Sequence, residues 1–302
     1  MTIEDGGVRP SPMRSKLFVP GCRPGLFSKA MGSAADAICF DLEDSVLRED
    51  KAAARANVRE FLLSKTVTGK HIVLRVNDSR STFFAEDLTA VVWPGIAIVT
   101  IPKTEDSSEV EELAAALSRL EKERSIARPI AILPTIESPR GLRQAHAIAS
   151  AHKRVIGLQL GLIDLFLPLG IKRQQGAAAY QVRLQLRLAA GEAALPCFDC
   201  AFPDYEDLDG FTADAAIARG LGFSGKSCIH PSQIPAANKI FTPTPEEIAT
   251  ARQILEKARD AAAEGLGAFA LGGRMIDQPM IRHAEETIEL YAALYRVSNS
   301  DV

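Results

Sequence analysis

The feature of this sequence that most constrains its fold is a series of eight short apolar runs separated by stretches with helical patterning. Each run is rich in aliphatic and aromatic residues, which is typical of strands buried on both faces of a parallel sheet. The runs occupy residues 16–21, 37–44, 71–77, 97–103, 129–137, 154–164, 195–204 and 223–231.

Helical patterns fill the intervals between these runs. Residues 105–124 show the pattern most clearly, because their apolar residues follow the 3.6-residue period and Ser108 with Glu111 has the spacing of a capping box. Eight strands alternating with helices favour a closed (β/α)₈ TIM barrel, with a doubly wound open sheet as the alternative. The other expected helices span residues 51–63, 140–151 and 177–193.

The last part of the sequence departs from this alternation. A long helical pattern ends near Gly265, a Gly-rich stretch follows, and a final helix carries an apolar stripe. A barrel requires nothing after its eighth helix, so we expect an appended helical lid or subunit contact. The expected organisation is a flexible tail over residues 1–13, a catalytic TIM barrel over 14–244 and the C-terminal lid over 245–302.

Composition excludes several classes of protein. A net charge of -3 provides no field for binding nucleic acid or an anionic membrane, and no apolar stretch reaches the roughly 20 residues of a membrane span. The N-terminus lacks the apolar core of a secretory signal, and five scattered cysteines indicate reduced thiols, so we expect a cytoplasmic protein. Cys197 and Cys200 have CxxC spacing, but we interpret them as core residues of a strand.

Two acidic residues follow apolar runs directly. Glu137 closes one run and Asp164 closes the next. An unpaired carboxylate does not stabilise a core, because its burial is costly. Two carboxylates at neighbouring strand ends are suited to a hard divalent cation such as Mg²⁺, with Mn²⁺ as an alternative.

Other polar residues also end the strand-like runs, and a barrel would gather all of them on one rim. They are Asp41, Glu43, Asp44, Arg75 and Lys103. Taken singly, Arg75 could neutralise the nearby acids, and Asp41 or Asp44 could cap a helix. Together they provide metal-suited acids, a guanidinium that can clamp a carboxylate and a further cation, which suits a metal-chelating oxo acid.

A second group of charged residues lies near the start of the predicted barrel. Arg14 and Lys16 precede a Gly-containing turn, and Arg23 and Lys29 lie within and beyond it. A turn of this kind that leads into a helix can bind phosphate oxygens, although ordinary surface charge is the alternative.

An ordered set of motifs then resembles a known family. The segments are RSKLFVPGCRPGLFSKA, ICFDLEDSV, LRVN, IPKTE, PTIESPRGL, GLIDL, GFSGKSCIHPSQI, FTPTPEEIATAR and GGRMIDQP. Together they resemble the citrate lyase beta-subunit-like branch of the HpcH/HpaI aldolase superfamily, which includes malyl-CoA, methylmalyl-CoA and citramalyl-CoA lyases.

The resemblance implies a TIM barrel with a C-terminal lid, a homotrimer or a hexamer of trimers, and Mg²⁺ as cofactor. By motif, Glu137 and Asp164 would be the metal ligands. Arg75 would grip the carboxylate of a 2-oxo acid, assisted by Lys103. Glu43 and Asp44 would lie around metal-bound water.

The same resemblance assigns Arg14, Lys16, Arg23 and Lys29 to coenzyme A phosphates. It assigns Asp277 to the lid, as an acid/base that reaches into a neighbouring subunit. Two departures stand out: the lid motif begins with Gly272-Gly273, and Leu162-Ile163 replaces a small residue and a glutamate. The apolar pair would alter the pocket wall, so no single substrate is transferred.

The expected activity is reversible cleavage of a 3-hydroxy-3-carboxyacyl-CoA to acetyl-CoA, or propionyl-CoA, and a 2-oxo acid. Three alternatives remain open. The same site could hydrolyse the thioester, act as a CoA-independent aldolase on 4-hydroxy-2-oxo acids, or serve as a citrate lyase subunit whose citryl group is presented by an acyl carrier protein. The sequence does not choose between glyoxylate, pyruvate and oxaloacetate.

Overall fold

The computed structural model of the chain describes residues 12–64, 70–172 and 176–295. The described residues form two compact units, which divide between Ile240 and Phe241. Most of the expected N-terminal tail, residues 1–11, lies outside the described part of the chain.

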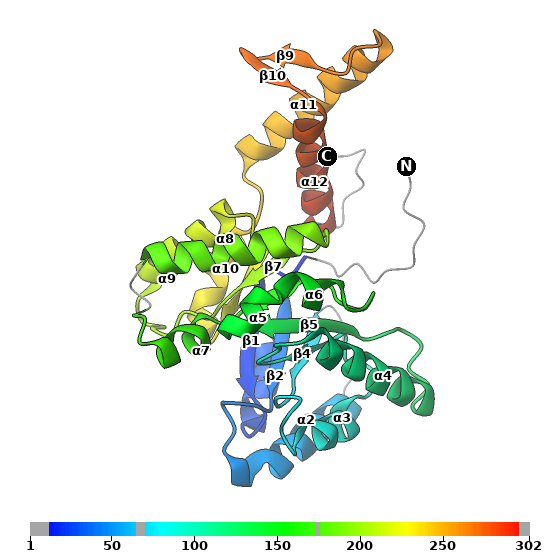
Figure 1. Cartoon of the computed structure of the whole chain (residues 1–302), viewed down its shortest axis with the longest axis vertical. Coiled ribbons are helices and arrows are strands. Elements are labelled where there is room, and N and C mark those ends of the chain that lie inside the picture. The colour runs from blue at the N-terminus through cyan, green and yellow to red at the C-terminus, as the bar shows by residue number, and fades with distance from the viewer. Residues whose placement is uncertain (1–11, 65–69, 173–175, 296–302) are drawn as a thin grey trace. The chain divides into compact units, whose positions relative to one another are not determined.

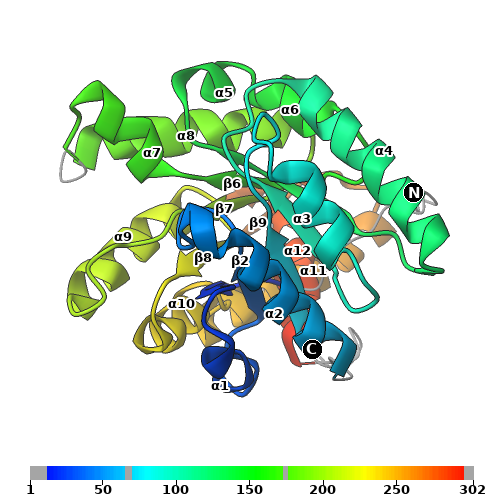
Figure 2. The ribbon, with the colours of Figure 1, turned by 90° about the horizontal axis from the view of Figure 1, so that it is seen from below.

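The first unit is a closed barrel of eight parallel strands in sequential order, which confirms the predicted TIM barrel (Figure 2). Each strand pairs with the next along the chain, and the first pairs with the eighth. The strands are β1 (Ser15–Pro20), β2 (Ala37–Asp41), β3 (His71–Arg75), β4 (Ile98–Ile101), β5 (Ala131–Ile136), β6 (Leu158–Leu160), β7 (Cys197–Asp199) and β8 (Gly225–Cys228).

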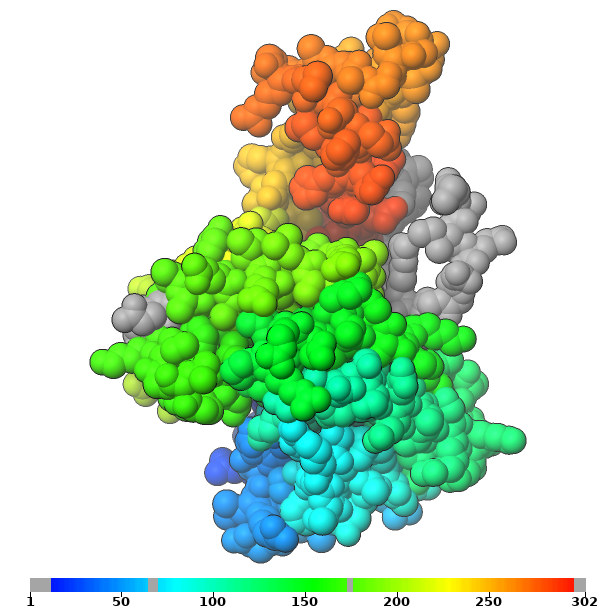
Figure 3. All heavy atoms as spheres, in the orientation of Figure 1, coloured from blue at the N-terminus to red at the C-terminus, as the bar shows by residue number. Residues whose placement is uncertain are grey.

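Helices surround the barrel and bury its outer face (Figures 1 and 2). In the space-filling view, the segments coloured cyan to green form a continuous outer surface (Figure 3). The helices of this unit are α1 (Phe27–Met31), α2 (Lys51–Ser64), α3 (Phe84–Val91), α4 (Ser107–Glu123), α5 (Pro139–Arg143), α6 (Ala145–Ser150), α7 (Leu162–Phe166), α8 (Gly176–Glu192), α9 (Leu208–Gly220) and α10 (Ile234–Ile240).

The capping box of α4 differs from the predicted one. Asp106 adopts an extended conformation and accepts a hydrogen bond from the amide of Ser108, while the Glu109 carboxylate accepts one from the amide of Asp106. Ser108 already lies within the helix, so the predicted Ser108–Glu111 pair was wrong by two residues. The Asp106–Glu109 pair satisfies amides at the helix N-terminus that would otherwise lack partners.

Two further expectations about helices need correction. The predicted helix over 140–151 is divided into α5 and α6, because Gln144 between them leaves the helical conformation, with φ −95° and ψ 6°. The apolar run that closes with Asp164 is not one strand: β6 ends at Leu160, and Asp164 lies in the short helix α7.

The interior of the barrel is an apolar cluster that reaches its N-terminal end. Met13 is 3% exposed and belongs to this cluster, together with residues from five of the strands and their flanks. The sequence predicted a flexible tail over residues 1–13. The buried position of Met13 shows that this prediction is wrong for residue 13. The other fully buried members are Ala37, Cys39, Val73, Ile98, Ala131, Leu133, Ile156 and Phe198.

The second unit is a pair of long helices with a short hairpin. Helix α11 (Pro245–Ala263) and helix α12 (Gln278–Tyr295) pack together, and the antiparallel strands β9 (Phe269–Leu271) and β10 (Arg274–Ile276) connect them. Apolar residues of both helices and Ile276 form its small core. None of the described helices is both long enough and apolar enough to span a membrane.

We predict that Met13→Ala lowers the free energy of unfolding by about 2–4 kcal/mol, because it opens a cavity at the end of the barrel core. Met275→Ala is the matched control, because Met275 is 72% exposed and should cost little. Urea denaturation of both variants measures the difference. Equal stability of the two variants would contradict the buried position of Met13.

Candidate functional site

The C-terminal rim of the barrel gathers the polar residues that the sequence placed at strand ends. Asp41 and Arg75 pair across β2 and β3, and the Arg75 guanidinium donates to both Asp41 oxygens, from Nε at 2.6 Å and from Nη2 at 2.7 Å. Burial alone would raise the pKa of Asp41, but the charge and hydrogen bonds of Arg75 hold that pKa below its ordinary value. Two of the three Arg75 nitrogens are therefore already engaged within the protein.

Glu43 lies between two cations. Lys103 Nζ donates to Glu43 Oε1 at 2.6 Å, and Arg75 Nη1 lies 3.0 Å from Glu43 Oε2. This second approach lacks hydrogen-bond alignment, so Oε2 is buried without a donor. Burial raises the pKa of Glu43 in spite of Arg75. Asp44 lies at the edge of the group, 3.3 Å from Lys103 Nζ and half exposed.

Glu137 and Asp164 complete the group. Glu137 follows β5 directly, is 5% exposed, and accepts one hydrogen bond at 2.6 Å, from the backbone amide of Lys103 to Oε1. Burial first, and then the charges of Glu43 and Asp164, raise the pKa of Glu137 to about 8. Among the described residues, Glu137 Oε2 and the Asp164 carboxylate have no hydrogen-bond donor or cation as partner.

This group fits a divalent cation by its charge and its donor atoms. Four carboxylates converge, those of Asp41, Glu43, Glu137 and Asp164, and the cations that contact them are Arg75 and Lys103. The excess of negative charge and the unpartnered oxygens match the preference of Mg²⁺ for oxygen ligands. Glu137 and Asp164 are the residues that would hold the ion.

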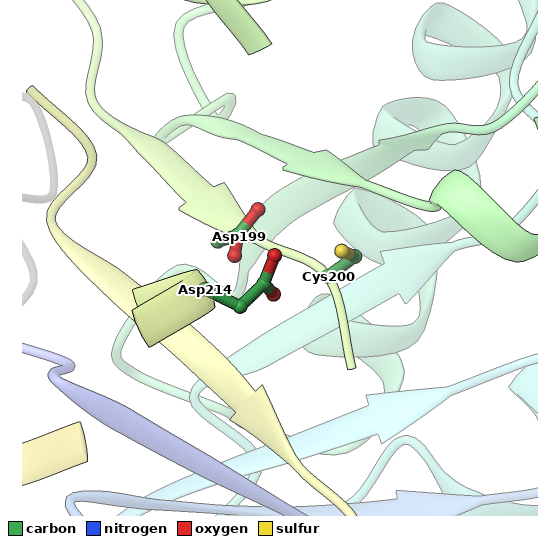
Figure 4. Close-up of side chains that lie close together, drawn as sticks. All are labelled: Asp199, Cys200 and Asp214. Atoms are coloured by element: carbon green, nitrogen blue, oxygen red, sulfur yellow. The ribbon is translucent and has the colours of Figure 1, made fainter. Parts of the chain in front are cut away.

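A second cluster of ligand-type atoms lies between the barrel and its helices. Atoms of Asp199, Cys200 and Asp214 lie within 4.8 Å of one another (Figure 4). Here two cations already balance the two acids: Arg183 contacts both aspartates, at 2.9 Å and 2.7 Å, and Lys226 also contacts both. The cluster is thus a buried ion-pair network that holds α8 and α9 to β7 and β8.

This network was missed at the sequence level. Lys226 lies within the eighth apolar run, and Arg183 sits within an otherwise Ala- and Leu-rich helical pattern. The partners are separated by 12 to 31 residues in sequence, so no local signal joins them. The cysteines Cys197 and Cys200 are free and buried, in agreement with their interpretation as core residues.

The predicted phosphate-binding group is divided by the structure. Arg14 precedes β1 and donates to both oxygens of Asp36 at 2.8 Å, at the N-terminal end of the barrel. Arg23 and Lys29 follow the C-terminal end of β1 and are exposed. A six-residue strand spans about 20 Å, so Arg14 cannot join them in one site.

Lys16 is also misplaced by the sequence interpretation. Its side chain is 2% exposed inside the barrel, where Nζ donates to Gln159 Oε1 at 2.8 Å and lies 5.1 Å from the centre of the Phe18 ring. Burial lowers the pKa of Lys16 to about 8. The Lys16 ammonium group is thus buried and already bonded to Gln159, so it is not available to bind phosphate.

An open pocket of about 410 Å³ adjoins the carboxylate group, shares Glu43, Asp44 and Lys103 with it, and extends to Arg48 and Phe83 in the loops after β2 and β3. Asp277 belongs to the second unit, where it lies between β10 and α12 and its carbonyl accepts from Ile281.

We predict that Glu137→Gln weakens Mg²⁺ binding by about tenfold or more while making the ion-free protein more stable at pH 8. The folded-state pKa of Glu137 lies above its ordinary value of 4.5, so the folded state holds an extra proton between about pH 4.5 and 8. The free energy of unfolding therefore falls as pH rises through that window. Calorimetric titration with Mg²⁺ and melting curves at pH 5 and pH 8 test both effects, and a lower melting temperature of the variant at pH 8 would contradict the account.

Comparison with known proteins places this geometry in a family. The family model described as HpcH/HpaI aldolase/citrate lyase matches residues 14–231. Citrate lyase subunit beta of Haemophilus influenzae is 37% identical over 91% of this chain and 96% of that protein. The L-malyl-CoA/beta-methylmalyl-CoA lyase of Cereibacter sphaeroides is 32% identical over 91% of this chain and 93% of that protein.

Solved structures agree with this comparison. The protein CitE of Mycobacterium tuberculosis in complex with magnesium, acetoacetate and coenzyme A has a TM-score of 0.76 and 33% identity, covering 94% of this chain and all of that chain. A citrate lyase beta subunit from the same organism, complexed with oxaloacetate and magnesium, has a TM-score of 0.66 and 32% identity over 77% of this chain and 98% of that chain. The chain belongs to the HpcH/HpaI aldolase/citrate lyase family.

Proposed function

We propose that this chain is a Mg²⁺-dependent carbon–carbon lyase that reversibly cleaves a 3-hydroxy-3-carboxyacyl-CoA, of malyl-CoA or citramalyl-CoA type, to acetyl-CoA and a 2-oxo acid. The observation that carries the proposal is the carboxylate group at the barrel rim, where Glu137 and Asp164 have oxygens without partners beside Arg75 and Lys103. The magnesium, acetoacetate, oxaloacetate and coenzyme A bound by the related structures support it.

In this proposal Glu137 and Asp164 hold the metal ion, and the other rim residues orient the acid. When bound, Mg²⁺ would polarise the carbonyl of the oxo acid and offset its negative charge. Asp41 occupies Nε and Nη2 of Arg75. Nη1 lies 3.0 Å from Glu43 Oε2 without a hydrogen bond to it, so Nη1 is the nitrogen that would donate to a substrate carboxylate. Lys103 Nζ would add a second charge-assisted contact from the pocket wall.

The proton transfers are assigned to Asp277. In cleavage, Asp277 would take the proton of the 3-hydroxyl. The C3–O bond then becomes the carbonyl of the 2-oxo acid, the bond between C2 and C3 of the acyl chain breaks, and the electron pair of that bond remains on the acetyl-CoA enolate. Asp277 then protonates that enolate carbon; in condensation it removes the same proton. A base carried by a lid acts only when the lid is closed, which keeps water away from the enolate.

Arg23 and Lys29 are the remaining candidates for contact with coenzyme A phosphates, because both are exposed at the C-terminal end of β1. Phosphate contacts with these two exposed cations would contribute to the Michaelis constant for the thioester rather than to the chemical step. We further propose a cytoplasmic homotrimer or hexamer, in which a neighbouring subunit would supply Asp277.

The proposal is tested by a coupled assay of the purified chain with Mg²⁺, in which malyl-CoA and citramalyl-CoA are offered in parallel. Acetyl-CoA formed together with glyoxylate or pyruvate, and abolished by EDTA, is the expected result. Free CoA without acetyl-CoA would identify a thioesterase instead.

The relatives named citrate lyase subunit beta favour one further candidate. In that case the chain would act on a citryl group presented by an acyl carrier protein and would be inactive on free CoA thioesters. Oxaloacetate release from citryl carrier protein, with silence on both CoA substrates, would establish it.

We predict that Asp277→Asn lowers kcat by about 10²-fold or more, because the amide cannot accept the α-proton. Mg²⁺ affinity should be unchanged, since Asp277 is not among the proposed metal ligands. Asp260→Asn is the control, because Asp260 is an exposed acid of the same unit whose carboxylate is paired with Lys257 at 3.5 Å. Near-normal kcat in Asp277→Asn would remove the acid/base role.

A further inference from the structure

We propose that Gly161 and the backbone of Lys103 together form a cradle that fixes Glu137, with Oε1 engaged and Oε2 left for a metal ion. The inference deepens the proposed function and rests on it for the identity of the ion as Mg²⁺. Gly161 and Lys103 would be positioning residues, because they act through Glu137 rather than on the substrate.

The first wall of the cradle is the backbone at Lys103. This residue has φ of 52°, in the left-handed region that residues other than glycine seldom adopt. The conformation directs its amide to Glu137 Oε1 at 2.6 Å, while its side chain reaches Glu43. Backbone strain that persists in a folded protein is commonly found at functional sites.

Neighbouring contacts hold that strained turn in place. The Lys103 carbonyl accepts a hydrogen bond from Arg80 Nη2 at 3.2 Å, and Arg80 is itself tied to Asp78 and Glu105 at 2.8 and 2.9 Å. The next amide, that of Thr104, pairs with β5 at Thr135. Hydrogen bonds from the Lys103 carbonyl and from the Thr104 amide thus stabilise the turn after β4 in which the Lys103 amide donates to Glu137.

The second wall is Gly161, directly after β6. Its amide donates to Ile136 at the end of β5, 3.0 Å away, so the two strand ends are locked side by side. A Cβ added at Gly161 would lie 2.3 Å from Glu137 Oε2 and 2.6 Å from Glu137 Cβ. Only a glycine at position 161 lets the Glu137 side chain lie in this position. The backbone φ of Gly161 is −125°, a value that any residue can adopt. The requirement is therefore one of space and not of backbone conformation.

The two walls leave Glu137 a single orientation. Oε1 is fixed by an amide, Oε2 lies against the Gly161 backbone without a donor, and the carboxyl is almost completely buried. A ligand held in advance avoids the loss of side-chain freedom when an ion binds. The cradle would therefore set the affinity for the ion.

The test is Gly161→Ala, with Mg²⁺ binding measured by calorimetric titration and folding by thermal melting. Groups that orient a metal ligand typically contribute 10- to 100-fold to affinity, and we expect a loss of about that size. Gly220→Ala is the matched control, because a Cβ built there has no heavy atom within 4 Å other than those of its own helical turn and chain neighbours. Wild-type Mg²⁺ affinity in folded Gly161→Ala would overturn the proposal.

A double-mutant cycle separates positioning from a general effect on folding. If Gly161 acts through Glu137, then adding Gly161→Ala to Glu137→Gln should change Mg²⁺ affinity little further. An equal loss in both backgrounds would overturn the positioning role. Because the titration needs no thioester, an absence of lyase activity would refute the proposed function while leaving this result intact.

Lys103 provides a second route if Gly161→Ala does not fold. Lys103→Gly and Lys103→Ala both remove the ammonium group and keep the amide, but only glycine adopts the left-handed conformation without strain. We expect the glycine variant to bind Mg²⁺ more tightly than the alanine variant. Equal affinities, or tighter binding by the alanine variant, would overturn the role of the Lys103 backbone.

Discussion

The repulsion among four carboxylates at one rim of the barrel, three of them buried and one half-buried, is the constraint on which the rest of the site depends. Asp41, Glu43, Glu137 and Asp164 converge there, and the cations in contact with them are Arg75 and Lys103. Such an excess of like charge destabilises the folded state unless protons or a cation offset it. Burial first, and then the repulsion by Glu43 and Asp164, raise the pKa of Glu137.

The ion-pair network behind β7 and β8 shows the contrasting arrangement. There Asp199 and Asp214 are matched by Arg183 and Lys226, and the pKa of Asp214 is held well below its ordinary value although burial opposes this. A balanced buried network orders helices against strands, whereas an unbalanced one retains capacity for a ligand. The same barrel therefore contains two dense charged clusters with different purposes.

The barrel could be predicted from the sequence because parallel strands that are buried on both faces consist of apolar residues. Each of the eight predicted apolar runs overlaps one of the eight barrel strands. Boundaries were less readable: the run that closes with Asp164 joins β6 to α7 without a polar break, so nothing local separates strand from helix. The Asp106 cap was missed because Ser108 offered an equally good capping residue two positions later.

The parts of the site that could not be predicted are the contacts between residues far apart in the sequence. The residue types at the strand ends indicated a metal and an oxo acid, but the Asp41–Arg75 pairing depends on strand register. Lys16 looked like a surface cation because its partner Gln159 lies 143 residues away. The left-handed turn at Lys103 and the space at Gly161 have no sequence signal, because each is defined by the position of Glu137.

The central claim, that a largely protonated Glu137 becomes a metal ligand, is tested most directly by counting protons released on Mg²⁺ binding. Calorimetric titration at pH 7 in buffers of different ionisation enthalpy gives that number. With a pKa of about 8, the account predicts release of close to one proton per ion at pH 7 and almost none at pH 9.5. Mg²⁺ binding without proton release at pH 7, or no binding at either pH, would contradict it.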